Sequence, residues 1–345
     1  MTNHLSIAID TGKHSTKAVA AINQTLQKIR FRTKAMEVRD LGVEIAANSY
    51  LIEYEGKAYL IGDMVAEDKT NYDISKHSME HLLCIYLAIT RFIEKSESAK
   101  FGIPNIRLAV NVPLSIYKNN TLKREYEQFI LNNQKAVSLR INHKPYIFRI
   151  QSVLLLPEAI GPIYSRISDF RGKRALVIDI GSLNISYCLF NDLVPQLDSM
   201  IMGNLGINIL RSKMAETLTS KFGILVSNED VEQILKDGYL YANGIKQEDS
   251  KEIVENLISA HVSEIFNYAK SRGITFNNTN VVFCGGGSVL LKEAILRQYP
   301  SASIENDGQF ANVLSYKKNY GGKRTCLRKK SALVLSKTAL IFMNT

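Results

Sequence analysis

A short segment that occurs twice constrains the fold of this chain more than any other feature. In the first copy an apolar run leads into Asp10 and Gly12, and in the second copy a similar run leads into Asp179 and Gly181. Apolar runs of this length that are rich in Ile and Val are typical of buried strands. Small polar residues follow each glycine, so each copy predicts a strand that ends in a tight polar turn.

Turns of this kind suit a phosphorylated ligand. Glycine lets the backbone approach a ligand closely, and the N–H groups of such a turn attract phosphate. A carboxylate at the end of the strand can hold a metal-bound water. Two such hairpins that face each other would clamp one polyphosphate and its Mg²⁺ from both sides. A single Asp-x-Gly turn is equally compatible with an ordinary hairpin, so this hypothesis depends on the pair.

A third segment combines a buried strand with a glycine-rich turn. The strand pattern covers residues 280–284, and a helical pattern follows over residues 289–295. Between them stand Gly285, Gly286, Gly287 and Ser288. Three consecutive glycines remove side chains where a flat base or a ribose would lie against the backbone. A plain strand-to-helix turn would rarely need all three.

Together the three segments resemble the phosphate-1, phosphate-2 and adenosine motifs of the actin, Hsp70 and sugar-kinase superfamily, in the same order. The chain looks most like the ParM-type actin-like ATPases that segregate bacterial plasmids. In that group a Pro-Glu pair, here Pro157-Glu158, opens the helix between the two halves. The resemblance implies an α/β chain with the two-domain actin-like ATPase fold. This fold consists of duplicated RNase H-like domains, mixed sheets flanked by helices, and a nucleotide in the interdomain cleft.

The resemblance also implies a role for each motif residue. Asp10 and Asp179 would face Mg²⁺, which keeps several waters and accepts carboxylate ligands. The residues that would surround the phosphates of ATP or GTP are Gly12, Lys13, Ser15, Thr16, Lys17, Gly181 and Ser182. Lys17 fits the position whose ammonium neutralises phosphate charge, with Lys13 as the alternative. Gly285, Gly286, Gly287 and Ser288 would lie against the adenosine, and Lys236 and Asp237 would contact the ribose.

Two features bear on hydrolysis. Glu158 is the candidate for polarising the attacking water, and Asp179 is a catalytic candidate as the second metal-facing carboxylate. The alternative for Glu158 is that its carboxylate simply favours the positive end of a helix. The second phosphate loop departs from the ParM-like pattern Asp-x-Gly-Gly-Thr-Thr, because Ser182, Leu183 and Asn184 replace the second Gly and both Thr. This loop therefore loses two hydroxyl donors, while its backbone N–H groups remain.

The helical and strand patterns predict two domains. Domain I is expected to cover residues 1–168 and domain II residues 169–309, and the family resemblance implies a C-terminal return to domain I over 310–345. Helices are predicted over 78–94, 158–168 and 227–241, among others, with Ser227 as an N-cap. The segment 310–313 resembles the second connecting segment of the family and would close the hinge.

Charge is distributed unevenly along the chain. The formal net charge is +10, but residues 309–345 hold eight Lys or Arg and no Asp or Glu. The rest of the chain therefore carries only +2, and we expect no direct DNA binding by the body. For the basic stretch 317–330 and the apolar stretch 331–342, two interpretations stay open. One is a solvated basic loop with a closing helix, and the other is a functional basic arm.

Cysteine usage and hydropathy indicate a cytoplasmic setting. The four cysteines, at positions 84, 188, 284 and 326, form no CxxC pair or metal-ligand spacing, and three lie in apolar runs, as reduced packed thiols do. No run of eighteen or more apolar residues predicts a membrane span, and the first residues do not resemble a signal peptide. No membrane partner is expected.

The function implied by the resemblance is that of a polymerising ATPase, with GTP as a possible second substrate. Its filaments would move plasmid DNA during segregation, and a DNA-bound partition adaptor would couple filament to cargo. Two alternatives stay open. One is an actin-like cytoskeletal protein that acts on the chromosome or cell shape. The other is a non-polymerising kinase of the superfamily, which would need a catalytic Asp for a substrate hydroxyl and a substrate pocket.

Overall fold

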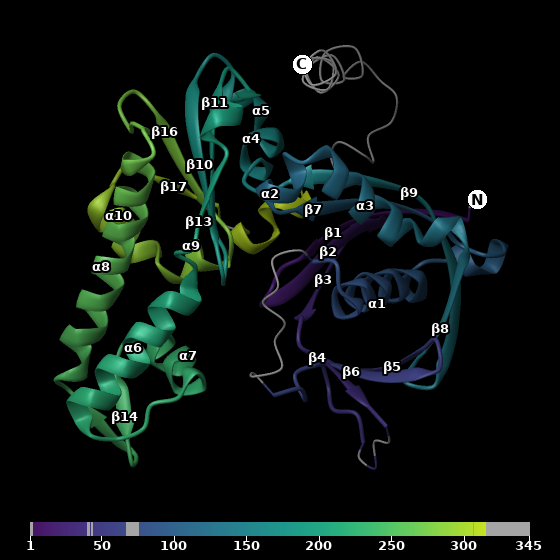
Figure 1. The fold of residues 1–345 in the computed structure, drawn as a ribbon, viewed down its shortest axis with the longest axis horizontal. Coiled ribbons are helices and arrows are strands. Elements are labelled where there is room, and N and C mark those ends of the chain that lie inside the picture. Colours follow the sequence, from purple (N-terminus) through teal and green to yellow (C-terminus); the bar gives the residue numbers. More distant parts are fainter. Residues whose placement is uncertain (1–2, 40–41, 43, 67–75, 306, 315–345) are drawn as a thin grey trace.

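The structure is a computed structural model that describes residues 3–39, 42, 44–66, 76–305 and 307–314. The predicted basic stretch 317–330, the apolar stretch 331–342 and Cys326 lie outside the described residues. In Figure 1 the purple and blue N-terminal half and the green C-terminal half each contain their own sheet with helices beside it. The predicted α/β class, with mixed sheets flanked by helices, is therefore confirmed.

The sheet of the N-terminal half has the strand order β3-β2-β1-β7-β9-β8-β5-β6-β4 within the described part of the chain. Its strands are β1 (His4–Thr11), β2 (Ser15–Ile22), β3 (Thr25–Arg32), β4 (Ala35–Val38), β5 (Ser49–Tyr54), β6 (Lys57–Gly62), β7 (Asn105–Val112), β8 (Ala136–Ile141) and β9 (Lys144–Pro157). The central strands β1, β7 and β9 are parallel. Their carboxyl ends therefore meet at one edge of the sheet, which brings Asp10, Asn111 and Glu158 to the same place.

A single helix fills the inside of this curled sheet. Helix α1 (Met79–Lys95) agrees with the predicted helix over 78–94, and its N-cap is Ser78, whose hydroxyl accepts a hydrogen bond from the N–H of His81 at 3.4 Å. Strands β3 and β4 stand at opposite ends of the strand order but follow one another in the chain. Between them, the carbonyl of Lys34 accepts a hydrogen bond of 3.0 Å from the N–H of Gly62, at the end of β6. Figure 1 shows the strands arranged around α1, which explains why most of this helix is buried.

Shorter helices cover the outside of the same sheet. They are η2 (Ser98–Phe101), α2 (Leu114–Tyr117), α3 (Asn120–Leu131) and η3 (Asn132–Gln134). Asn119 caps α3, because its side-chain oxygen accepts from the N–H groups of Thr121 and Leu122 at 3.0 and 3.1 Å. The hairpin turn between β5 and β6 is formed by Glu55 and Gly56, both at positive φ.

The C-terminal half repeats the strand pairing around its own Asp-x-Gly hairpin. Its strands are β10 (Arg174–Ile180), β11 (Ile185–Asn191), β12 (Val194–Pro195), β13 (Ile201–Gly203), β14 (Leu240–Ala242), β15 (Ile245–Gln247), β16 (Asn280–Cys284) and β17 (Ser303–Ile304). Strand β10 pairs antiparallel with β11 and parallel with β16, just as β1 pairs with β2 and β7. The duplication predicted from the two sequence copies is therefore present in the pairing of the strands.

Helices pack on this second sheet through a core of their own. They are α6 (Ile207–Phe222), α7 (Asn228–Asp237), α8 (Ser250–Ser271), α9 (Gly286–Leu290) and α10 (Lys292–Gln298). The short helix η4 (Leu197–Ser199) lies between β12 and β13, and η5 (Gly308–Phe310) follows β17. The cap at Ser227 is confirmed as a capping box with Asp230. The predicted helix over 227–241 is too long, because α7 stops at Gly238, whose φ of +84° ends the helix.

The segment between the halves is more irregular than predicted. One helix over 158–168 was expected, but β9 runs to Pro157 and the next residues form a turn in which Ala159 has a φ of +60°. Two short helices then follow, α4 (Gly161–Ser165) and α5 (Ile167–Phe170). Glu158 therefore lies in a turn before α4 and not in its first turn. The prediction of one continuous helix is wrong, because a left-handed residue interrupts the backbone hydrogen bonds before α4 begins.

A third group of buried side chains joins the two halves. It includes Ala8, Ala109 and Ile160 from the first half, Val177 and Val282 from the second, and Ala311 and Val313 from the end of the described chain. Cys84, Cys188 and Cys284 are buried free thiols, as predicted. No helix among the described residues is long and apolar enough to span a membrane.

Candidate functional site

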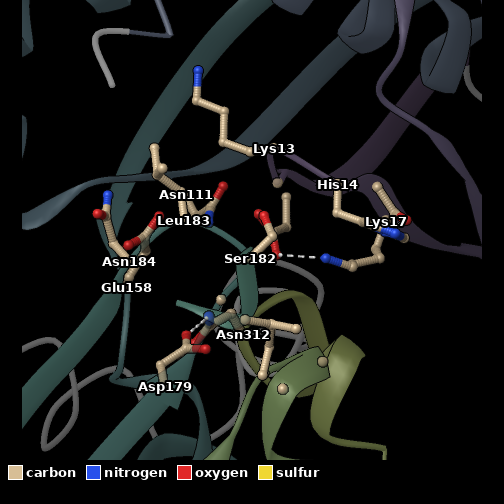
Figure 2. Close-up of a pocket in the computed structure, with 18 of the residues that line it drawn as sticks. Lys13, His14, Lys17, Asn111, Glu158, Asp179, Ser182, Leu183, Asn184 and Asn312 are labelled. Carbon is tan, nitrogen blue, oxygen red and sulfur yellow. Dashed lines mark hydrogen bonds and ion pairs between the residues drawn. The ribbon is translucent and has the colours of Figure 1, made fainter. Parts of the chain in front are cut away.

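A cavity of about 250 Å³ lies where the two halves meet, at the carboxyl ends of β1, β7, β9, β10 and β16. The predicted site residues that line it are Asp10, Gly12, Lys13, Ser15, Lys17, Glu158, Asp179, Gly181, Ser182, Gly285, Gly286 and Gly287. Figure 2 shows side chains of the two halves directed toward this common space. Residues from four distant parts of the chain are thus brought to one cavity.

The first hairpin presents a carboxylate and a lysine side by side. Asp10 on β1 is paired in register with Lys17 on β2, and the Lys17 ammonium lies 3.8 Å from the Asp10 carboxylate. A Cβ at Gly12 would lie 2.9 Å from the carbonyl oxygen of Ser15, so the turn is too tight for a side chain. Thr16, also predicted to contact phosphate, is fully buried beside Thr33 and does not line the cavity.

The second hairpin is held by the start of α6. The N–H groups of Gly206, Ile207 and Asn208 donate to the carbonyls of Leu183, Gly181 and Ser182 at 2.9–3.1 Å. The carbonyl groups of the loop are therefore occupied, and its shape is fixed by contacts to the helix. Leu183 and Asn184, which replace the two threonines of the family pattern, both line the cavity.

The glycine-rich turn is required by packing against β10. Gly285 has a φ of +86°, and a Cβ there would lie 2.4 Å from both the Asp179 carboxylate and the Ile180 carbonyl. A Cβ at Gly287 would lie 2.3 Å from the Ile180 side chain. The sequence suggested a ligand as the reason for these glycines, but contact with the neighbouring strand alone is enough to explain Gly285 and Gly287. Ser288 is buried, donates to the carbonyl of Gly285 at 2.8 Å, and does not line the cavity.

Asp179 is the most strongly perturbed carboxylate of the cavity. Burial, and to a lesser extent the nearby negative charge of Glu158, raises the pKa of Asp179 to about 6. The side-chain amide of Asn312 donates to Asp179 at 2.7 Å and opposes this effect (Figure 2). A buried carboxylate that faces a second carboxylate is a favourable place for a cation.

Glu158 is held at both of its oxygens. Lys76 Nζ lies 3.4 Å from Oε1, and the hydroxyl of Ser186 donates to Oε2 at 3.1 Å. Its backbone N–H donates to the carbonyl of Val112 at 3.2 Å. The carboxylate is thus fixed in the cavity by partners from both halves of the chain, and two of its lone-pair directions remain for other groups.

Asn111 was not predicted as a site residue. It sits at the end of β7 between the two neighbouring parallel strands, is 1% exposed, and lines the cavity. Its Oδ1 has no hydrogen-bond partner among the described residues. A buried polar atom without a partner is costly, so Asn111 is suited to a ligand or a bound water in this cavity.

An ionic cluster joins the two halves beside the cavity. Glu232 on α7 lies 2.7 Å from Arg211 on α6 and 3.4 Å from His14 in the first hairpin, and Arg32 on β3 lies 4.0 Å away. The hydrogen bond with His14 and the two arginines lower the pKa of Glu232 to about 2, while burial lowers the pKa of His14. The predicted ribose residues Lys236 and Asp237 lie further along α7 and do not line the cavity.

The residues that sequence reasoning missed share one property. His14, Lys76, Asn111, Arg211 and Glu232 come together only after folding. Of these five, only His14 lies within a sequence motif, the first Asp-x-Gly turn, and no role was expected for it. One weak signal existed for Asn111, because it is a polar residue at the end of an apolar strand pattern, like Asp10. Among the described residues no group of three or more His, Cys, Asp or Glu side chains is placed to hold a metal ion.

Comparison with known proteins agrees with this geometry. Residues 8–161 match the family described as actin like proteins N terminal domain. The structure of an Alp12 filament is 26% identical, with a TM-score of 0.68, and the match covers 93% of this chain and 99% of that one. No curated protein matches the sequence.

Two further solved structures are similar in fold. Ta0583, an archaeal actin homolog, has a TM-score of 0.75 at 15% identity, and covers 92% of this chain and 99% of its own. A 15-stranded ParM filament from Clostridium botulinum has a TM-score of 0.73 at 18% identity, with the same coverage. The chain therefore has the actin-like fold, and its first half matches the N-terminal domain of actin-like proteins.

Proposed function

We propose that this chain is a nucleoside triphosphatase whose nucleotide state controls its assembly into filaments. One observation carries the proposal: two Asp-x-Gly hairpins, one from each half, meet at a single cavity that contains both Asp10 and Asp179. A ligand held by both hairpins would bind only when the halves are close together. Its terminal phosphate would therefore favour one relative position of the two halves. That position would in turn determine which surface is available for contact with another copy of the chain.

The residues present fit a nucleoside triphosphate with Mg²⁺. Lys13, Lys17, Arg30 and Arg211 supply positive charge around the cavity, and Asn111 supplies an unpartnered buried oxygen. Mg²⁺ usually binds through one or two carboxylates together with substrate phosphates, so Asp10 and Asp179 would be enough to hold it. When bound, Mg²⁺ would neutralise the charge that develops on the phosphates.

We assign each motif to one part of the nucleotide according to its place in the cavity wall. Gly12, Lys13, Ser15 and Thr16 of the first hairpin, with Lys17, would surround the phosphates opposite Gly181 and Ser182. Thr16 would act from behind the turn. The glycine turn at Gly285, Gly286 and Gly287, with Ser288 beneath it, would lie against the nucleoside. Ta0583 has been solved in complex with ADP, which supports a nucleotide as the ligand. The choice between ATP and GTP is left to experiment.

The ribose contact of Lys236 and Asp237 stays a prediction. In the described structure it is Glu232, one turn earlier on α7, that contacts residues of the cavity wall.

Glu158 is proposed to orient the attacking water. Its carboxylate lines the cavity and is held by Lys76 and Ser186, so it has a defined direction. A carboxylate so placed can accept a proton from water as the water attacks the terminal phosphate. The alternative role, stabilising a helix N-terminus, is weakened because Glu158 precedes α4 by a turn that contains Ala159.

The domain division is proposed as residues 1–168 with 310–345, and residues 169–309. Two connecting segments would form the hinge, and they cross where Gly161 approaches Ala311 and Asn312. A Cβ at Gly161 would lie 2.6 Å from the carbonyl oxygen of Ala311, so the two segments are in backbone contact. The side chain of Asn312 also accepts from the N–H of Gly161 at 3.3 Å. Asn312 thus links the hinge to Asp179 in the cavity.

Plasmid segregation is the proposed cellular role. Several similar structures are filaments, among them AlfA from the B. subtilis plasmid pLS32 and the ParM filament from Clostridium botulinum. A DNA-bound adaptor would connect filament and cargo, because the body of the chain carries only a small net charge. Three buried reduced thiols agree with a cytoplasmic location.

Phosphate release and nucleotide binding test the enzymatic part of this proposal. The wild-type protein should bind Mg-ATP or Mg-GTP and release phosphate, and Asp10→Ala should weaken binding strongly. Glu158→Gln should bind nucleotide with nearly unchanged affinity, while phosphate release falls by about 10²–10⁴-fold, the usual contribution of a general base. An exposed carboxylate outside the cavity, replaced in Glu248→Gln, is the matched control. Phosphate release from Glu158→Gln at the wild-type rate would refute the role of Glu158.

A further inference from the structure

Lys76 is a buried lysine in the wall of the cavity, and no motif includes it. The residue is 3% exposed and precedes α1 with a φ of +53°. A buried ammonium group is costly unless it is paired, and a non-glycine residue at positive φ adds strain. Both costs indicate that the surrounding structure holds Lys76 in place, and its ammonium is directed to the Glu158 carboxylate at 3.4 Å.

The distribution of charge in the cavity indicates that Glu158 is the carboxylate that Lys76 stabilises. Asp10 is already paired with Lys17, and Asp179 accepts from Asn312. Arg211, the other strongly engaged cation of the cavity, is paired with Glu232. Lys76 therefore supplies the positive charge that faces Glu158.

Both oxygens of Glu158 are held, but in different ways. Ser186 donates a hydrogen bond to Oε2 at 3.1 Å, whereas the 3.4 Å contact from Lys76 to Oε1 is longer. Without Lys76, Glu158 would face Asp179 across the cavity with no compensating charge. It would then be free to rotate about its hydrogen bond to Ser186. That rotation would turn the carboxylate away from a water in the cavity.

We propose that Lys76 is a positioning residue that keeps the Glu158 carboxylate aimed at the attacking water. This inference rests on the proposed function, in which Glu158 orients that water. Lys76 itself donates no proton and forms no bond in the reaction. It acts through Glu158, so its effect should appear in the rate of hydrolysis and not in the affinity for nucleotide.

Lys76→Met tests this inference in the full-length protein, because methionine has a similar shape and no charge. We expect kcat for phosphate release to fall by about 10–100-fold, the scale expected when a reacting group is misplaced by about 1 Å. The Kd for Mg-ATP and Mg-GTP, measured by calorimetry, should change less than about threefold. The matched control is Lys34→Met, which removes another buried lysine, one that does not line the cavity.

A second measurement separates positioning from a merely structural role. Methylammonium added to Lys76→Met should restore part of the lost kcat, because it can occupy the space of the missing amine, and it should not restore kcat in Glu158→Gln. In addition, Lys76→Met introduced into Glu158→Gln should cause no further loss of kcat. If Lys76→Met does not fold, Lys76→Gln, which keeps a donor to Glu158, replaces it in the same assays.

The outcomes distinguish a failure of the proposed hydrolysis from a failure of the proposed role of Lys76. A wild-type protein that binds nucleotide but releases no phosphate would refute the proposed hydrolysis itself. Wild-type turnover together with an unchanged kcat in Lys76→Met would refute the inference about Lys76 and leave the proposed function standing. Equal losses of kcat in the single variant and in the Glu158→Gln background would also overturn it, because Lys76 would then act independently of Glu158.

Discussion

Replacing Asp179 with asparagine should stabilise the protein in the absence of nucleotide and metal. Burial and the negative charge of Glu158 hold the pKa of Asp179 at about 6, compared with an ordinary value of 3.8. The folded state therefore binds a proton more tightly than the unfolded state, and the wild-type protein loses stability as the pH rises from about 3.8 to about 6. The full difference corresponds to about 3 kcal/mol, which is an upper bound because the chain can relax around the charge.

The difference in the free energy of unfolding between Asp179→Asn and the wild type has a predicted sign and a predicted pH range. Asparagine keeps the shape of the side chain and can still accept from Asn312, but it carries no charge. The free energy of unfolding of Asp179→Asn should therefore equal that of the wild type below about pH 3.8. It should exceed the wild-type value by about 1–3 kcal/mol above pH 6.

Urea denaturation in EDTA at pH 5.0 and 7.5 measures this difference, and thermal unfolding gives a second estimate. The same variant should lose most of the stabilisation that Mg-nucleotide confers on the wild type, because it removes a ligand of the proposed metal. Glu248→Gln is a control, because Glu248 is an exposed carboxylate outside the cavity. If Asp179→Asn is no more stable than the wild type at pH 7.5 without nucleotide, the electrostatic account of the cavity is incorrect.

Three further predictions concern the hinge, the ionic cluster and the first long helix. Gly161→Ala should lower the free energy of unfolding by about 1–3 kcal/mol in urea, because its Cβ would overlap the crossing backbone; Gly42→Ala, which meets no atom within 4 Å, should cause no loss. Glu232→Gln should cost about 1–2 kcal/mol at pH 7, because the carboxylate faces Arg211 and is only 27% exposed. The stability from Glu232, whose folded pKa is about 2 against an ordinary 4.5, should disappear as the pH falls from 4.5 to 2, so wild-type and variant urea curves should converge there. Ser78→Ala should cost about 1 kcal/mol by calorimetry, since it removes the cap of α1; an unchanged unfolding temperature would contradict that role.

Local patterns predicted the parts of the fold that depend on neighbouring residues. The two Asp-x-Gly hairpins, the glycine turn and the helix that begins after Ser78 all follow from periodicity, glycine and capping residues within short segments. The pairing of β1 with β7, and of β10 with β16, could be expected from the family resemblance but not from any local signal. Parallel pairing of this kind depends on contacts about a hundred residues apart.

Interactions between distant residues explain what could not be predicted. Lys76 meets Glu158, and Glu232 meets His14, only because separate elements converge on the cavity. The predicted helix from Glu158 failed for a similar reason, because close packing of Gly161 against Ala311 constrains the turn before α4. Sequence reasoning identified the residue types of the site. The geometry that holds those residues came from packing between the two halves.

Electron microscopy of the purified protein with and without nucleotide tests the central claim most directly. At tens of micromolar, the wild-type protein should form filaments with Mg-ATP or Mg-GTP and should remain unassembled in EDTA without nucleotide. Asp10→Ala, which removes one carboxylate of the paired hairpins, should assemble poorly under the same conditions. Monomers in every condition would contradict the account, and so would filaments whose number is the same with and without nucleotide.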